Sequence, residues 1–162
     1  MFENFGEFDS CAEINLLATN LLAEGDTESI MKLALENGID EDDALDFIDG
    51  CVDDLCTPLM AAQGKLSIER DSIDVPASIF MDWLTYIRGR CMESVEFCVA
   101  VRHKNKSLAG CFAAILKWSF SHQYTVPADI IKAAGISASK VTLGIPGQAD
   151  AKEIITKYYM EG

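Results

Sequence analysis

Among the side chains that could take part in catalysis or ligand binding, carboxylates form the densest cluster in this sequence. Eight of them lie between residues 40 and 54, namely Asp40, Glu41, Asp42, Asp43, Asp46, Asp49, Asp53 and Asp54. Carboxylates perform acid–base catalysis where an apolar pocket separates their pKa values. The short helical patterns around this group predict no such pocket. We therefore interpret the eight residues as a surface that binds a basic protein partner.

The spacing of possible ligands argues against a metal site. A calcium-binding loop that starts at Asp40 needs glycine at its sixth position and glutamate at its twelfth, where this chain has Leu45 and Cys51. Zinc sites typically use closely paired cysteines. No such pair occurs among the six cysteines, which are Cys11, Cys51, Cys56, Cys91, Cys98 and Cys111. We expect reduced, mostly buried thiols, no metal and no cofactor.

Nucleophilic catalysis is not indicated either. A hydrolase needs a nucleophile with a base beside it, and the chain has only two histidines, His103 and His122. Neither lies in a recognisable nucleophile motif. We expect that the protein is not an enzyme.

The charge is strongly uneven along the chain. The net charge is −13, but residues 1–81 hold nineteen acidic against three basic side chains, whereas residues 82–162 hold seven acidic against ten basic. The first half would repel nucleic-acid phosphates and attract basic surfaces, including those of proteins that bind nucleic acid. An acidic half that only keeps a small protein in solution is the alternative interpretation.

The sequence contains no apolar run long enough to cross a bilayer. Its first residues, Met1 to Asn4, lack the basic region and apolar stretch of a signal peptide. We expect a cytoplasmic protein that does not contact membranes.

Basic residues in the second half support a competing hypothesis of nucleic-acid binding. They are Arg102, Lys104, Lys106, Lys132 and Lys140. Pro127 predicts the start of a helix that ends at Gly135, and Ser137 predicts the cap of a short second helix that stops at Gly144. This helix-turn-helix-like corner would serve conjugative transfer or transcription. A simple helical corner is the other interpretation, because two lysines are few for DNA.

Periodic apolar residues predict a mainly α fold. A central helix is expected from Ser107 to Phe120, with an apolar face of Leu108, Cys111, Phe112, Ile115, Leu116 and Phe120. Ser10, Asp26 and Asp40 predict the caps of three short helices, the third carrying Ala44, Leu45 and Ile48.

Between these parts, Thr57 and Pro58 predict a short helix that Gly64 closes, and residues 65–75 are expected to form a hinge. Leu66 and Ile68 alternate with polar residues, which is compatible with a brief extended segment. From Pro76 the pattern is helical again. We expect a compact multi-helix domain with an acidic helical N-terminal lobe, residues 1–64, and a helical core region, residues 76–162, either separate or as one continuous domain.

From about Trp83 onward, the sequence resembles the PcfK-like proteins of conjugative plasmids and transposons in Gram-positive bacteria. The resemblance rests on Arg102, Lys104, Lys106-Ser107-Leu108, Cys111, Ala114-Ile115 and the terminal pair Tyr158-Tyr159. It implies an accessory protein of a mobile genetic element. Because one small relative is an anti-CRISPR inhibitor of the type II effector nuclease, it also implies Cas9, or its guide-RNA complex, as a partner. Nuclease channels that hold guide RNA and DNA are basic, which suits an acidic helical surface. The acidic residues 1–75 lie outside the resemblance.

Overall fold

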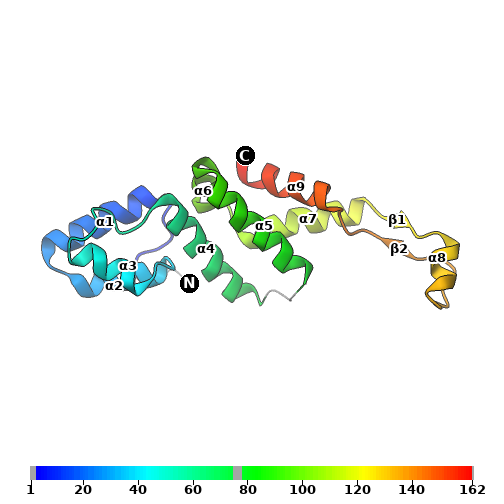
Figure 1. Cartoon of the computed structure of the whole chain (residues 1–162), viewed down its shortest axis with the longest axis horizontal. Helices are drawn as coiled ribbons and strands as arrows, with labels where there is room; N and C mark the ends of the chain where they lie inside the picture. Colours follow the sequence, from blue (N-terminus) through cyan, green and yellow to red (C-terminus); the bar gives the residue numbers. More distant parts are fainter. Residues whose placement is uncertain (1–2, 75–77, 162) are drawn as a thin grey trace.

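The chain folds as a series of helices, which confirms the expected mainly α class. A computed structural model describes residues 3–74 and 78–161. Figure 1 shows an elongated arrangement, with helices α1 to α3 at one end and a protruding arm at the other. The elements are α1 (Cys11–Glu24), α2 (Thr27–Glu36), α3 (Glu41–Ile48), α4 (Pro58–Ile73), α5 (Ile79–Glu93), α6 (Val95–Arg102), α7 (Leu108–Ser121), β1 (Tyr124–Thr125), α8 (Ala128–Ala133), β2 (Thr142–Leu143) and α9 (Gln148–Met160).

Helices α1 to α3 begin directly after Ser10, Asp26 and Asp40 as predicted, although the Asp40 side chain makes no capping hydrogen bond. The Ser10 hydroxyl accepts a hydrogen bond from the Glu13 N–H, and the Asp26 carboxylate accepts one from the Ser29 N–H. α1 ends at Gly25, which has a φ of 74°, a conformation that costs glycine little. These helices surround one hydrophobic cluster, formed by Ile14, Ala18, Ile30, Leu33, Ala34, Ile39, Ala44, Phe47, Leu55, Cys56 and Ala61.

Helix α4 corrects the expected hinge. It runs unbroken from Pro58 to Ile73, so neither a helix end at Gly64 nor an extended segment near Leu66 is present. Gly64 is buried inside this helix because the turn after α2 packs directly on it. A Cβ atom on Gly64 would lie 2.1 Å from the Asn37 carbonyl oxygen. The glycine therefore permits close packing between helices, and the last position of the expected hinge, residue 75, lies outside the described residues.

The same helix joins two cores. Ala61 belongs to the first hydrophobic cluster, whereas Ala62 and Leu66 belong to the second. The second cluster also takes side chains from α5, α6, α7 and α9, including Leu84, Ile87, Phe97, Leu108, Cys111, Ile115, Ile155 and Tyr159. The proposed boundary at residue 64 thus falls within an element that both regions share, and the proposed start of the second region at 76 lies outside the described residues.

The predicted central helix is present as α7, with Ser107 as its cap. Its first half is core, since Leu108, Cys111 and Ile115 are at most 1% exposed. Its second half is not, because Leu116 and Phe120 are 57% and 76% exposed. The apolar face therefore continues past the end of the body that covers it.

Residues 121–146 form an arm that leaves the body after α7 and returns to α9 (Figure 1). β1 and β2 pair antiparallel, with Tyr124 opposite Leu143 and Thr125 opposite Thr142, and α8 lies between them. The second helix expected after Ser137 is absent from this fully described stretch. The helix-turn-helix-like corner is therefore wrong, because β-branched Thr142 pairs as a strand instead.

Candidate protein-docking surface

The eight predicted carboxylates gather on α3 and on the loop that follows it. We call Asp40, Glu41, Asp42, Asp43, Asp46, Asp49, Asp53 and Asp54 the acidic surface. Seven of them are exposed and Asp43 is half-buried. Asp40 occupies the N-cap position of α3 and Asp49 the C-cap position. The short helix thus presents the charges outward rather than toward the core.

The acidic surface is not neutralised by the chain's own cations. Among residues 3–74 and 78–161, every ion pair joins side chains outside this group. Lys32, a basic residue of the N-terminal lobe, pairs with Glu28 on its own helix. The charges on α3 and its loop are therefore available to a partner.

The position of the carboxylates along α3 carries a stability cost. Glu41, Asp42 and Asp43 lie in the first turn, where the helix dipole stabilises negative charge. Asp46 and Asp49 lie toward the opposite end, whose last turn has no basic residue. An acidic side chain there opposes the dipole by about 0.3–1 kcal/mol. The stability of α3 therefore does not account for these two carboxylates.

Exposed apolar side chains lie among the charges. Leu45 on α3 is 43% exposed and Val52 in the following loop is 45% exposed. The sequence pattern assigned Ala44, Leu45 and Ile48 to the apolar face of this helix; Ala44 is buried and Ile48 packs against the core, but Phe47 is buried in place of Leu45. A one-residue shift of the apolar face exposes Leu45, and an eight-residue helix is too short for its periodicity to reveal that shift.

A shallow pocket adjoins the acidic surface. Its volume is about 290 Å³, and it lies beside α2 and the start of α3. Its lining is Glu28, Met31, Lys32, Ala34, Leu35, Ile39 and Glu41. Leu35 is 78% exposed at this site. Protein interfaces combine apolar anchors with a charged rim, and this end of the molecule offers both.

The predicted basic turn between α6 and α7 is used for folding. Arg102 is 2% exposed and its guanidinium donates a 2.7 Å hydrogen bond to the Asn37 side chain. The prediction that Arg102 contacts nucleic acid is therefore wrong. Lys106 donates hydrogen bonds from its ammonium to the carbonyl oxygens of Tyr158 and Glu161, at 2.6 and 3.1 Å. Its charge holds the end of α9 rather than an outside ligand.

Two residues of α4 organise this turn from inside. The Lys65 ammonium, on a side chain only 1% exposed, donates to the carbonyl oxygens of His103 and Lys106 at 2.6 and 2.7 Å. Four residues later, the Glu69 carboxylate accepts the Leu108 N–H at 2.7 Å. The Lys65 cation lies at the C-terminal end of α6 and the Glu69 anion at the N-terminal end of α7, and the helix dipoles stabilise a charge of that sign at each end. Burial raises the pKa of Glu69, although the Leu108 hydrogen bond and nearby Lys65 act in the opposite direction.

The N-terminal segment is fastened to the same turn. Glu7 pairs with Lys65 at 2.7 Å, and Asp9 contacts the His103 ring at 3.1 Å and accepts the Lys104 N–H at 3.0 Å. Hydrogen bonds from Lys104 and His103 lower the pKa of Asp9. Of the predicted basic residues, Lys104 on this turn and Lys132 and Lys140 on the arm are exposed. They do not form one continuous basic patch with Arg102 and Lys106.

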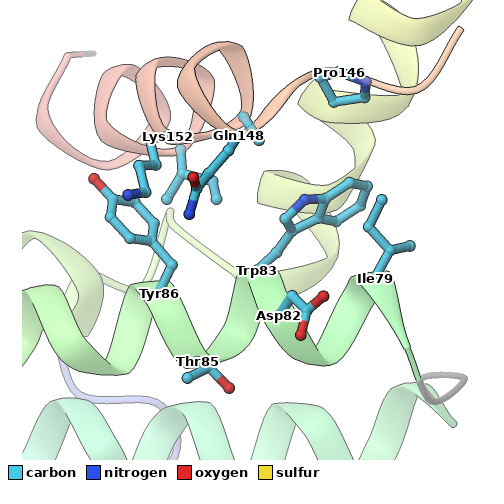
Figure 2. Close-up of a pocket in the computed structure, with 10 residues that line it drawn as sticks. Ile79, Asp82, Trp83, Thr85, Tyr86, Pro146, Gln148 and Lys152 are labelled. Atoms are coloured by element: carbon cyan, nitrogen blue, oxygen red, sulfur yellow. The ribbon is translucent and has the colours of Figure 1, made fainter.

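A larger cavity lies between α5 and α9. Its volume is about 540 Å³ and it is open to solvent. Figure 2 shows Trp83 and Tyr86 reaching from α5 toward α9, with the Lys152 ammonium beside the Tyr86 ring, 5.3 Å from its centroid. Asp82 and Gln148 supply the other polar groups near the indole. Among the described residues that line the cavity there is no histidine, cysteine or serine.

The cysteines have the environment of core thiols. Cys56, Cys91, Cys98 and Cys111 are buried, Cys11 is half-buried and Cys51 is exposed, and all six are free. Burial raises the pKa of Cys56, Cys91 and Cys111 to about 12, so these thiols are protonated at neutral pH and are poor nucleophiles. Within residues 3–74 and 78–161, no three potential histidine, cysteine or carboxylate ligands come together as a metal site.

None of the helices within the described ranges is both long and apolar enough to span a bilayer. Comparison with known proteins adds no family to these observations. No protein-family model, curated protein or solved structure matches the chain. The resemblance to PcfK-like proteins therefore stays a prediction from the sequence.

Proposed function

We propose that this protein is a non-enzymatic accessory protein of a mobile genetic element that binds a basic protein through its acidic surface, and that the partner is the Cas9 effector nuclease, which it inhibits. The observation that carries the binding proposal is that seven of the eight carboxylates are exposed and that none of the eight has an ion-pair partner among the described residues. A surface needed only for solubility requires neither exposed apolar groups nor carboxylates at an unfavourable helix end. Both features favour docking over solubility alone.

The choice of partner rests on the PcfK-like resemblance and on charge. Cas9 holds its RNA–DNA heteroduplex in a positively charged channel. An acidic surface that also carries Leu45, Val52 and the pocket beside Leu35 has the chemistry to occupy such a channel. Occupation of the channel would exclude nucleic acid and so inhibit the nuclease.

The direct test is binding to purified Cas9, with and without guide RNA, over a range of salt concentrations. Electrostatic association weakens as salt screens the charges. The sharpest variant replaces Asp46, Asp49 and Asp53 by lysine. Lysine in the first turn of α3 would oppose the helix dipole, and these three residues lie outside that turn. We expect the affinity to fall at least about a hundredfold, since like charges facing each other across an interface cost several kcal/mol.

The matched control makes the same change in net charge elsewhere. Glu93, Glu153 and Glu161 are exposed acidic residues of the second half of the chain, and their triple replacement by lysine should leave the affinity within a few-fold of wild type. If both triple variants bind equally, the acidic surface is not the contact. If wild-type protein does not bind Cas9 in either form, Cas9 is not the partner.

Nucleic-acid binding in conjugative transfer or transcription is the second candidate. Exposed Lys104, Lys132 and Lys140 support it, while the burial of Arg102 and the internal hydrogen bonds of Lys106 weaken it. It predicts a gel shift of duplex DNA that alanine at Lys104 and Lys106 removes. A shift that survives these changes, or no shift, would reject this basic turn as a DNA contact.

A further inference from the structure

The arm has almost no core of its own. Of residues 121–145, all of which are described, only Ile131 is buried, and it is 9% exposed. α8 has six residues and each strand has two. Isolated helices of this length and two-stranded hairpins are at best marginally stable in water. The arm therefore needs a covering surface to hold its conformation.

The root of the arm is tightly fixed, which gives the arm a defined direction. A Cβ atom on Gly144 would lie 2.3 Å from the Ser119 carbonyl oxygen of α7, so the returning chain runs close against that helix. Trp118 on α7 stacks on His122 at the start of the arm, with their ring centroids 4.2 Å apart. The uncovered part begins beyond this root.

Exposed apolar side chains occur from the end of α7 along the arm. They belong to large apolar residues between 51% and 76% exposed, namely Leu116, Phe120, Tyr124, Ile130, Ile136, Leu143 and Ile145. We call this set the arm surface. It exposes on the order of 700 Å² of side chain, close to the roughly 800 Å² that each partner buries in a standard protein interface. A stable contact therefore has enough area here.

We propose that the arm surface is covered by the same surface of a second copy of this chain, in a two-fold symmetric dimer. The small charge of the arm favours a second copy of the chain as the partner. Residues 116–145 contain three lysines and one aspartate, in a chain whose net charge is −13. Two copies that meet through their arms place their acidic lobes at opposite ends, because the arm and helices α1 to α3 lie at opposite ends of the molecule (Figure 1). A contact between the two acidic lobes would instead bring like charges together.

Other occupants fit the arm less well. A basic protein is drawn to the acidic surface at the far end, not to a region with a slight positive charge. Duplex DNA binds through many cations, and Lys132 and Lys140 are the only lysines between Ser121 and Ile145. An apolar surface with few charges is typical of contacts between identical subunits.

The test is the mass of the full-length protein in solution, by sedimentation equilibrium across a wide range of protein concentration. We expect a dimer with twice the 17.7 kDa chain mass. The double variant Ile130→Gln and Leu143→Gln should raise the dissociation constant at least about tenfold, because two apolar anchors are lost. Both residues are more than half exposed in the single chain, so the body should keep its fold.

The matched control is Leu35→Gln with Met92→Gln, two exposed apolar residues away from the arm. This variant should remain dimeric, and both variants should keep the wild-type helical circular dichroism. Hydrogen exchange in residues 124–143 should slow as protein concentration rises. A monomeric wild type, a dimer that persists in the arm variant, or arm protection that appears only on addition of duplex DNA would each overturn the proposal.

Discussion

Replacement of Lys65 by methionine tests the role of the buried cation in α4. The ammonium donates to the carbonyl oxygens of His103 and Lys106 and pairs with Glu7 at 2.7 Å, all from a side chain that is 1% exposed. Methionine fills similar space but removes every one of these contacts. Carbonyl groups at the end of α6 and the carboxylates of Glu7 and Glu69 would then lack their cation.

The expected cost follows from burial. Loss of one partner of a buried ion pair typically destabilises by about 3–5 kcal/mol, because the remaining charge has no compensation. For a chain of this size the loss corresponds to a fall in Tm of about 6–20 °C. The comparison is Lys32→Met, whose ammonium also pairs with a glutamate at 2.7 Å but on the surface, with a side chain 53% exposed. A surface pair contributes about 0–1 kcal/mol.

Urea unfolding followed by far-UV circular dichroism measures both variants. We expect Lys65→Met to lower the free energy of unfolding by several times as much as Lys32→Met. Equal effects, or a loss below about 1 kcal/mol for Lys65→Met, would refute the conclusion that Lys65 stabilises the turn between α6 and α7.

Two further predictions concern close packing and the N-terminal segment. Gly64→Ala should destabilise by at least about 1–3 kcal/mol in the same urea assay, because its Cβ would collide with the Asn37 carbonyl; a neutral change would contradict that contact. Burial acts to raise the pKa of Glu36, but hydrogen bonds from the N–H groups of Asn4, Phe5 and Glu3 outweigh it and lower that pKa below 4.5. The contribution of Glu36 is therefore present above its unfolded pKa and lost as pH falls through the folded value. The Phe5 amide should lose protection from hydrogen exchange, after correction for the intrinsic pH dependence of exchange, as the pH falls through the folded pKa of Glu36. Glu36→Gln should weaken this pH dependence of protection. A profile that Glu36→Gln leaves unchanged would contradict the role of the Glu36 carboxylate.

Local signals in the sequence predicted the helix starts well. Ser10, Asp26, Thr57 and Ser107 each accept a backbone hydrogen bond in the first turn of their helices, as capping residues do. Such caps depend on residues three apart in the chain. Their geometry can therefore be predicted from sequence spacing alone.

The expected hinge failed because its residues are governed by distant contacts. Gly64 is a typical helix terminator, but here it allows the turn at Asn37 to pack against α4. Lys65 and Glu69 look like surface charges, yet they bind the turn formed by residues 103–108. Nothing in the sequence around α4 shows which carbonyl groups it will meet.

In the candidate sites too, some features follow from the local sequence and others depend on tertiary contacts. The exposure of seven of the eight carboxylates from Asp40 to Asp54 could be predicted because so many like charges cannot share a core, whereas the half-burial of Asp43 could not. Arg102 could not be assigned, since its burial depends on Asn37 in another lobe. The exposure of Leu45 and of the arm depends on which surfaces the tertiary fold leaves uncovered, and apolar periodicity does not report that.

The central claim is that the acidic surface binds Cas9, and the most direct measurement is the affinity of purified Cas9 for wild-type protein and for the Asp46, Asp49 and Asp53 lysine variant at low and high salt. Our account predicts binding by the wild type that weakens steeply with salt and a loss of at least about a hundredfold in the variant at low salt. Binding that is indifferent to salt and unchanged by the three substitutions would contradict it.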